Sequence, residues 1–183
     1  MSREKTADEV LQSVMDSLDN SQDELDQPSR PSAPEEREAA EWTVAGIEGS
    51  TRVSTDFGEV PAHLVRVRDK LRSKDGRFLR VIRISEYKLD QRFLDLYPDA
   101  RPVVIRPQAL GRRFPMNTVQ LSPAQRVAVP SDWSNRDCER ADKLSSARAS
   151  VDQTLGQVTY YSFDLGEPTM VQCEGLWVES HMN

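Results

Sequence analysis

LSPAQRVAV, residues 121–129, is the stretch that decides the fold of this chain. Leu121 leads into a Ser122-Pro123 turn, and Val127 and Val129 then recur at every second position, as in a strand with one buried face. Gln125 lies at the tip of the turn, where a reactive protein would place a base. The loop is shaped like a functional site, yet its tip carries a neutral amide.

The same β pattern extends over residues 43–183. Short runs rich in β-branched and aromatic residues alternate with turn signals, and Asp75-Gly76 suits a tight hairpin turn. The charged stretch 136–144 is expected to form one helical turn. Many short strands of this kind predict a mostly β, sandwich-like or barrel-like fold. The expected strands are 51–55, 63–67, 77–84, 101–107, 117–122, 125–129, 157–165 and 169–180.

Residues 1–42 are predicted to be a separate leader. Its first 40 residues hold 11 acidic and four basic side chains. Capping boxes at 6–9 and 32–35 predict a helix over about 7–19 and a short helix over 34–42, with a polar, proline-rich linker at 19–34. Trp42 is interpreted as a packing anchor. The first helix places five apolar side chains on one face, which we expect to dock on the domain or on a protein partner: Val10, Leu11, Val14, Met15 and Leu18.

Composition excludes several classes of protein. The chain has 183 residues and a net charge of −6, but the part after residue 40 holds 19 acidic and 20 basic side chains and is long enough to bury a core. No apolar run has the length needed to span a bilayer, and the start of the chain lacks an apolar signal core. We therefore expect a cytoplasmic protein that binds no membrane, no metal and no cofactor.

The histidines and cysteines do not assemble a catalytic motif. His63 is interpreted as a structural or surface residue, and His181 lies too close to the chain end to carry weight. Cys173 alternates with apolar neighbours and is expected in the core, whereas Cys138 lies among charges and is expected to be exposed. Both cysteines are expected to stay reduced.

Residues 65–84 are rich in arginine and lysine. Arg66, Arg68 and Arg83 are the candidates for a basic face that holds the phosphate backbone of a nucleic acid. A solvated strand face is the alternative, since Lys and Arg also protect sheet edges. The near-neutral charge of the domain favours this second interpretation.

Three ordered blocks resemble the Hedgehog/intein (Hint) domain family. The first, residues 46–65, resembles the family's opening block, a Cys-Phe pair followed by Thr-Arg-Val-x-Thr and Gly-Glu. The second is LSPAQRVAV, which is similar to a Leu-Ser/Thr-Pro-x-His-Arg-Val block. The third, residues 158–180, resembles the closing strands. The matching residues are Thr51, Arg52, Val53, Thr55, Gly58, Glu59, Thr159, Tyr160, Tyr161, Glu174, Gly175, Leu176, Glu179 and Ser180.

The resemblance implies a horseshoe-like, mostly antiparallel β fold whose active members rearrange their own backbone. In them the opening cysteine attacks the preceding carbonyl, and the block histidine helps to break that peptide bond. Here the cysteine position holds Gly46 and the histidine position holds Gln125, while Ser162 and Pro168 stand where further histidines are expected. An amide cannot shuttle a proton near neutral pH as imidazole does. Thr51, Ser122 and Ser162 remain as residues that could line the site.

Three hypotheses follow. The first is a catalytically inactive Hint domain that acts as a binding or structural module. The second is residual self-cleavage through a non-standard nucleophile, with Ser50, Thr51 or Cys173 as candidates. The third is nucleic-acid binding by residues 65–84. The final ESHMN resembles the His-Asn end of a splicing element, but Met182 separates the pair.

Overall fold

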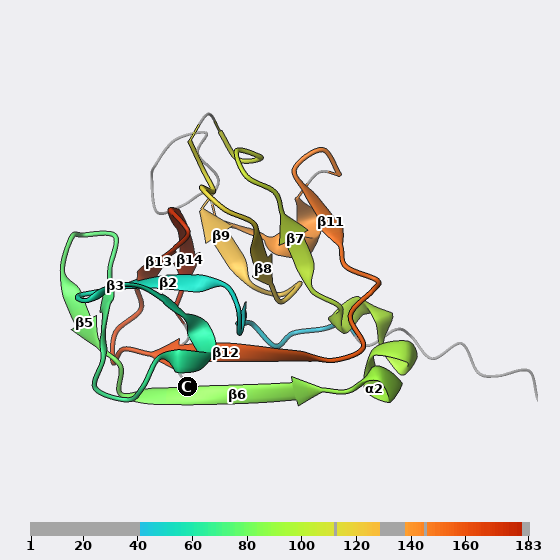
Figure 1. Ribbon diagram of the computed structural model, residues 1–183, viewed down its shortest axis with the longest axis horizontal. Helices are drawn as coiled ribbons and strands as arrows, with labels where there is room; N and C mark the ends of the chain where they lie inside the picture. The colour runs from blue at the N-terminus through green and yellow to red at the C-terminus, as the bar shows by residue number, and fades with distance from the viewer. Residues whose placement is uncertain (1–40, 112, 129–137, 145, 181–183) are drawn as a thin grey trace, which may run out of the picture. The chain divides into compact units, whose positions relative to one another are not determined.

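The computed structural model describes residues 41–111, 113–128, 138–144 and 146–180 (Figure 1). The predicted leader helix with its apolar face, the linker and His181 lie outside these residues. Within the described residues, no helix is both long enough and apolar enough to cross a membrane.

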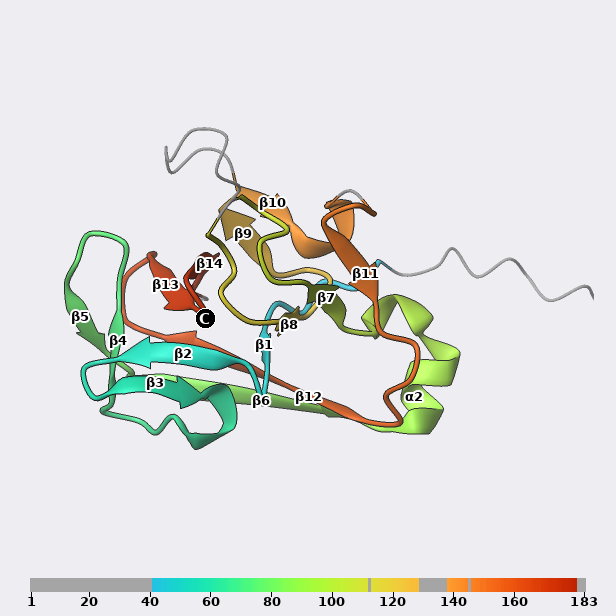
Figure 2. The ribbon, with the colours of Figure 1, turned by 45° about the horizontal axis from the view of Figure 1, so that its top comes forward.

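Two antiparallel sheets make up the described domain (Figures 1 and 2). The six-stranded sheet has the order β11 (Ala149–Val151), β7 (Val103–Ile105), β8 (Val119–Leu121), β1 (Ile47–Glu48), β12 (Val158–Asp164) and β6 (Arg83–Leu89). The eight-stranded sheet has the order β10 (Cys138–Arg140), β9 (Arg126–Ala128), β14 (Leu176–Glu179), β13 (Met170–Cys173), β2 (Arg52–Thr55), β4 (Lys70–Arg72) and β5 (Phe78–Arg80), with β3 (Gly58–Pro61) paired to β2. The mostly β prediction is confirmed.

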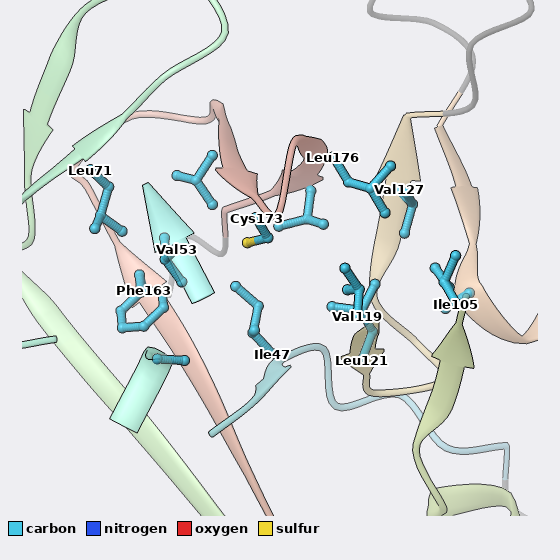
Figure 3. Packing of buried hydrophobic residues seen from close by; sticks show 14 of the residues in the cluster. Ile47, Val53, Leu71, Ile105, Val119, Leu121, Val127, Phe163, Cys173 and Leu176 are labelled. Atoms are coloured by element: carbon cyan, nitrogen blue, oxygen red, sulfur yellow. The ribbon is translucent and has the colours of Figure 1, made fainter. Parts of the chain in front are cut away.

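The hydrophobic core explains why apolar residues recur at every second position along several strands. Figure 3 shows apolar side chains from both sheets packed together, among them Ile47, Val53, Leu121, Val127 and Phe163. Burial of such side chains stabilises the fold by roughly 1.5–3 kcal/mol each. In β7, β8, β13 and β14 every second residue lies in this cluster, as the strand pattern predicts.

A second, smaller cluster surrounds Tyr160, which is fully buried. Trp42 packs against it and meets the ring of Phe93 edge to face, with 6.0 Å between ring centroids. Phe93 lies in α2 (Gln91–Leu96), a helix that the sequence analysis missed although Asp90 caps it by accepting from the Phe93 amide. Trp42 is thus a packing anchor, as expected.

Several predicted elements differ from those observed. Residues 63–67 do not form a strand, because the 3-10 helix η1 (Ala62–Leu64) leads into a turn in which Arg68 has φ +84°. Stretch 77–84 is divided between β5 and β6. Where one helical turn was expected, the described residues 138–144 contain β10 followed by the 3-10 helix η3 (Ala141–Lys143). A third 3-10 helix, η2 (Pro98–Ala100), follows α2. The expected run 169–180 is a hairpin, because Glu174 (φ +47°) and Gly175 (φ +86°) form its turn.

Candidate functional site

Gly46 and the Ser122-Pro123 turn lie in direct contact. The Ser122 amide donates to the carbonyl oxygen of Gly46 at 2.9 Å, just ahead of β1. Gln125 follows in the same turn, and its amide N–H donates to the Ser122 carbonyl at 2.9 Å. Gly46 and Gln125, the positions where the resemblance expects a nucleophile and a base, therefore both hydrogen-bond to the backbone of Ser122.

The Ser122 hydroxyl holds the segment that leads to Gly46. It is fully buried, accepts from the Trp42 indole Nε1 at 2.8 Å, and donates to the carbonyl oxygen of Val44. Arg140 adds a second tie, donating to the Trp42 carbonyl at 3.0 Å and pairing with Glu41 at 3.1 Å. The hydroxyl donates its only proton to the Val44 carbonyl, so Ser122 holds the segment from Trp42 to Val44 in place. Sequence reasoning missed these partners, which are far away along the chain.

Gln125 has a structural role. Its side chain is 3% exposed, and its Nε2 donates to the carbonyl oxygens of Glu179, at 2.9 Å, and Arg126, at 3.2 Å. The Gln125 carbonyl accepts from the Ala141 amide at 2.9 Å. The amide therefore links the turn to the end of β14.

Little space remains for a side chain at position 46. A Cβ atom placed there would lie 2.8 Å from the Cβ of Tyr160 and 3.4 Å from the carbonyl oxygen of Tyr161. Tyr160 is anchored, because its hydroxyl donates to the Ala100 carbonyl at 2.7 Å. Burial, reinforced by the charge of Glu48, raises the pKa of Tyr160 far above its ordinary value. The backbone here approaches β12 as closely as only a glycine permits.

The other residues that the sequence analysis placed at the site have different surroundings in the structure. Thr51 is buried, and its hydroxyl donates to the Gln120 carbonyl at 3.2 Å and accepts from the Gln120 amide at 3.0 Å, so it ties the start of β2 to β8. Ser162 is half-buried in β12 opposite Ser85. Among the described residues, no hydrogen bond joins Ser162 to Gly46 or Gln125. Pro168 lies in the loop before β13 and lines an open groove of about 490 Å³.

The two cysteines differ in burial. Cys173 is fully buried, and burial, with the nearby charges of Glu59 and Glu174, raises the pKa of its thiol well above the ordinary value. Cys138 was expected to be exposed but is half-buried, because it lies in β10 with its Sγ 3.8 Å from Met170 Sδ. Its prediction as an exposed thiol was wrong because β10 packs against β9.

Three groups converge on the Gly49–Ser50 peptide bond, a constellation that sequence reasoning missed. One carboxylate oxygen of Glu48 accepts from the Ser50 hydroxyl at 2.5 Å and from the Ser50 amide at 2.9 Å. The Gly49 carbonyl oxygen accepts from the His63 amide at 3.1 Å and lies 2.6 Å from His63 Nδ1. No spacing in the sequence placed His63 here, because η1 brings it back against β1.

Ion pairs interrupt the predicted basic face. Arg66 and Arg68 are exposed, but Arg83 pairs with Asp164 at 3.2 Å. In the β4–β5 hairpin, Arg77 pairs with Asp75 and with Glu167, each at 2.5 Å. The arrangement matches a solvated face crossed by ion pairs more closely than a continuous phosphate-binding surface.

Comparison with known proteins identifies the family. A family model described as the Hint domain matches residues 47–183. The chain therefore belongs to the Hint domain family, and the predicted Hint fold is confirmed. The matched region begins one residue after Gly46. A search of curated proteins gave no match.

Solved structures of inteins share this fold. The MchDnaB-1 intein aligns with a TM-score of 0.50 at 13% identity, over 74% of this chain and 99% of its own. The gp41-1 intein aligns with a TM-score of 0.51 at 10% identity, over 76% and 100%. A DnaB intein from Synechocystis sp. PCC 6803 aligns with a TM-score of 0.51 at 13% identity, over 76% and 100%. At such low identity these likenesses concern the fold alone.

Proposed function

We propose that this Hint domain does not carry out backbone rearrangement at position 46 and acts as a binding or structural module. The observation that carries the proposal is Gln125, whose side-chain Nε2 donates to the backbone carbonyls of Glu179 and Arg126. Acyl transfer needs an attacking atom and a group that takes its proton. Position 46 has no side chain, and Gln125 is not a base.

The nearby hydroxyls do not replace the missing nucleophile at this bond. Ser122 and Thr51 each donate their proton to a backbone carbonyl, of Val44 and Gln120 respectively. What remains is a set of contacts that hold the segment 41–46 against the domain. These contacts suit a structural or binding module.

The leader supplies the docking element of this proposal. The apolar face of its predicted helix, described above, would bind a protein partner. Replacing Leu11 and Leu18 by Glu should abolish binding to a purified partner while leaving the circular dichroism of the β domain unchanged. Unchanged binding by this variant would argue against the leader as the docking element.

A second candidate function is self-cleavage at the Gly49–Ser50 bond, which the constellation around Glu48 favours. The Ser50 Oγ would attack the Gly49 carbonyl carbon, forming an ester as the bond to the Ser50 nitrogen breaks. Glu48 contacts both the atom that loses the proton, at 2.5 Å, and the nitrogen that gains it, at 2.9 Å. His63 would stabilise the charge that develops on the Gly49 oxygen. Water would then hydrolyse the ester.

Intact mass spectrometry separates the two candidates. The full-length chain, incubated with and without hydroxylamine, should give a single unchanged mass if the domain is a non-cleaving module. Fragments 1–49 and 50–183 that vanish in Ser50→Ala would establish the second candidate. The chain contains no Asn-Gly pair, so hydroxylamine has no cleavage site of that kind to confuse the result. Cleavage between residues 45 and 46 would contradict both candidates.

A further inference from the structure

β6 forms one end of the six-stranded sheet. Among the described residues, β12 is the only strand that pairs with it (Figure 1). The pairing runs without interruption from Arg83, opposite Asp164, to Leu89, opposite Val158. The outer edge of β6 therefore presents a continuous row of backbone donors and acceptors.

This edge is unlike the other ends of the two sheets. The terminal strands β11, β10 and β5 have three residues each, and β3 starts at Gly58 and ends at Pro61. β6 has seven residues and contains neither glycine nor proline. Proteins usually keep exposed edge strands short or interrupt them, because a long regular edge recruits another strand.

The ladder identifies which backbone groups face outward. In an antiparallel sheet, a residue directs both its N–H and its C=O to one neighbouring strand, and the next residue directs them to the other. Gly49 donates to the carbonyl oxygen of Thr159 at 3.1 Å, so the odd-numbered residues of β12 face β1. The even-numbered residues of β12 then bond to β6 through Leu89, Tyr87 and Ser85.

The outward groups of β6 consequently belong to Ile84, Glu86 and Lys88. Glu86 and Lys88 have exposed side chains on one face, where Lys88 Nζ lies 3.3 Å from Glu86 Oε1. Glu86 also accepts from the Tyr161 hydroxyl at 2.9 Å, which fixes the direction of its side chain. Two opposite charges are thus held next to the unpaired backbone groups.

We propose that two copies of the chain pair through β6, in antiparallel register, with Glu86 of each copy opposite Lys88 of the other. The twofold axis passes through Tyr87. This register satisfies the outward backbone groups of Glu86 and Lys88 and forms two opposite-charge pairs across the edge. The contact is self-complementary, as a twofold interface must be.

The neighbouring registers are disfavoured by charge. A slip of two residues in one direction places Glu86 opposite its own copy, and a slip in the other direction places Lys88 opposite its own copy. Like charges directly opposite each other destabilise an antiparallel pair, whereas opposite charges contribute roughly 0.2–1 kcal/mol. The alternation of charge along β6 therefore selects one register among those that the backbone allows.

Charge reversal tests the proposal in the full chain. Light scattering after gel filtration should show a dimer for the natural chain and monomers for the variants E86K and K88E. An equimolar mixture of the two variants should form a heterodimer, because one edge then carries two positive charges and the other two negative charges. The charge pair within each chain stays broken in both variants, so only pairing between chains explains such a rescue.

Arg148→Glu, at the opposite end of the same sheet beside β11, is the matched control and should remain dimeric. Circular dichroism should show that all variants keep the β fold. A natural chain that stays monomeric at its highest soluble concentration would overturn the proposal. So would a dimer that persists in both single variants, since it would have to form through another surface.

Discussion

The side-chain amide of Gln125 donates to the carbonyl oxygen of Glu179 at 2.9 Å, across 54 residues of chain. This bond joins the turn after β8 to the last residue of β14. The side chain at the position where an active relative would carry its base therefore connects the turn after β8 to β14 of the eight-stranded sheet. Gln125 has a structural role in this fold, and its loss should be visible as a loss of stability.

Gln125→Ala should destabilise the domain by about 1–3 kcal/mol, because it removes a buried side chain and the two hydrogen bonds that it donates to the carbonyls of Glu179 and Arg126. The free energy of unfolding from urea titration measures the effect. Gln157→Ala, at an exposed glutamine ahead of β12, is the control and should change stability by less than about 0.5 kcal/mol. Equal effects of the two substitutions would contradict the structural role of Gln125.

Gly46→Ala should also destabilise the domain, because the new methyl group would lie 2.8 Å from the Cβ of anchored Tyr160. Overpacking of this kind costs about 1–3 kcal/mol. Gly156→Ala is the matched control, since the nearest atom there is the mobile end of Gln91, at 3.0 Å. Thermal unfolding should show a large fall in Tm for the first variant and a small change for the second. A neutral Gly46→Ala would show that β1 can move away from β12.

The turn between β8 and β9 could be predicted from sequence because its determinants are local. Leu121, the Ser122-Pro123 pair and Val127 specify a turn between two strands by themselves. Hence the fold class, inferred through the family resemblance, agrees with the structure.

The hydrogen-bond partners of Ser122 and Gly49 could not be predicted, because they depend on which strands pair and in which register. The bond from Trp42 to Ser122 spans 80 residues, and His63 reaches Gly49 only through η1, where a strand was predicted. A shift of one residue in a strand turns every side chain to the other face. Sequence alone therefore identifies residues that depart from the family pattern more readily than it identifies their contacts in the fold.

Stability at acid pH should depend on Asp75. Hydrogen bonds from the Ser73 hydroxyl and from Arg77 lower the pKa of Asp75 to about 2 in the folded chain. Its unfolded value is near 3.9. A lowered folded pKa contributes stability that is present above the unfolded value and is lost as the pH falls toward about 2.

Urea titrations at a series of acid pH values measure this contribution. The natural chain should lose stability more steeply below the unfolded pKa than Asp75→Asn, which has no carboxylate to protonate. Asp99→Asn, at an exposed position in η2, should follow the natural curve and serves as the control. Parallel curves for the natural chain and Asp75→Asn would show that the turn does not hold its carboxylate ionised.

Thiol labelling should distinguish the two cysteines. Cys138 lines an open groove, whereas Cys173 is fully buried and its pKa is raised by that burial. Because the thiolate is the reacting species, native protein should be labelled by iodoacetamide at Cys138 and should react at Cys173 only after unfolding. Peptide mapping by mass spectrometry locates the label, and Cys138→Ser should give native protein without label. Rapid labelling of Cys173 in folded Cys138→Ser would mean that β13 opens to solvent, and the core around Val53 would then be less rigid than its packing indicates.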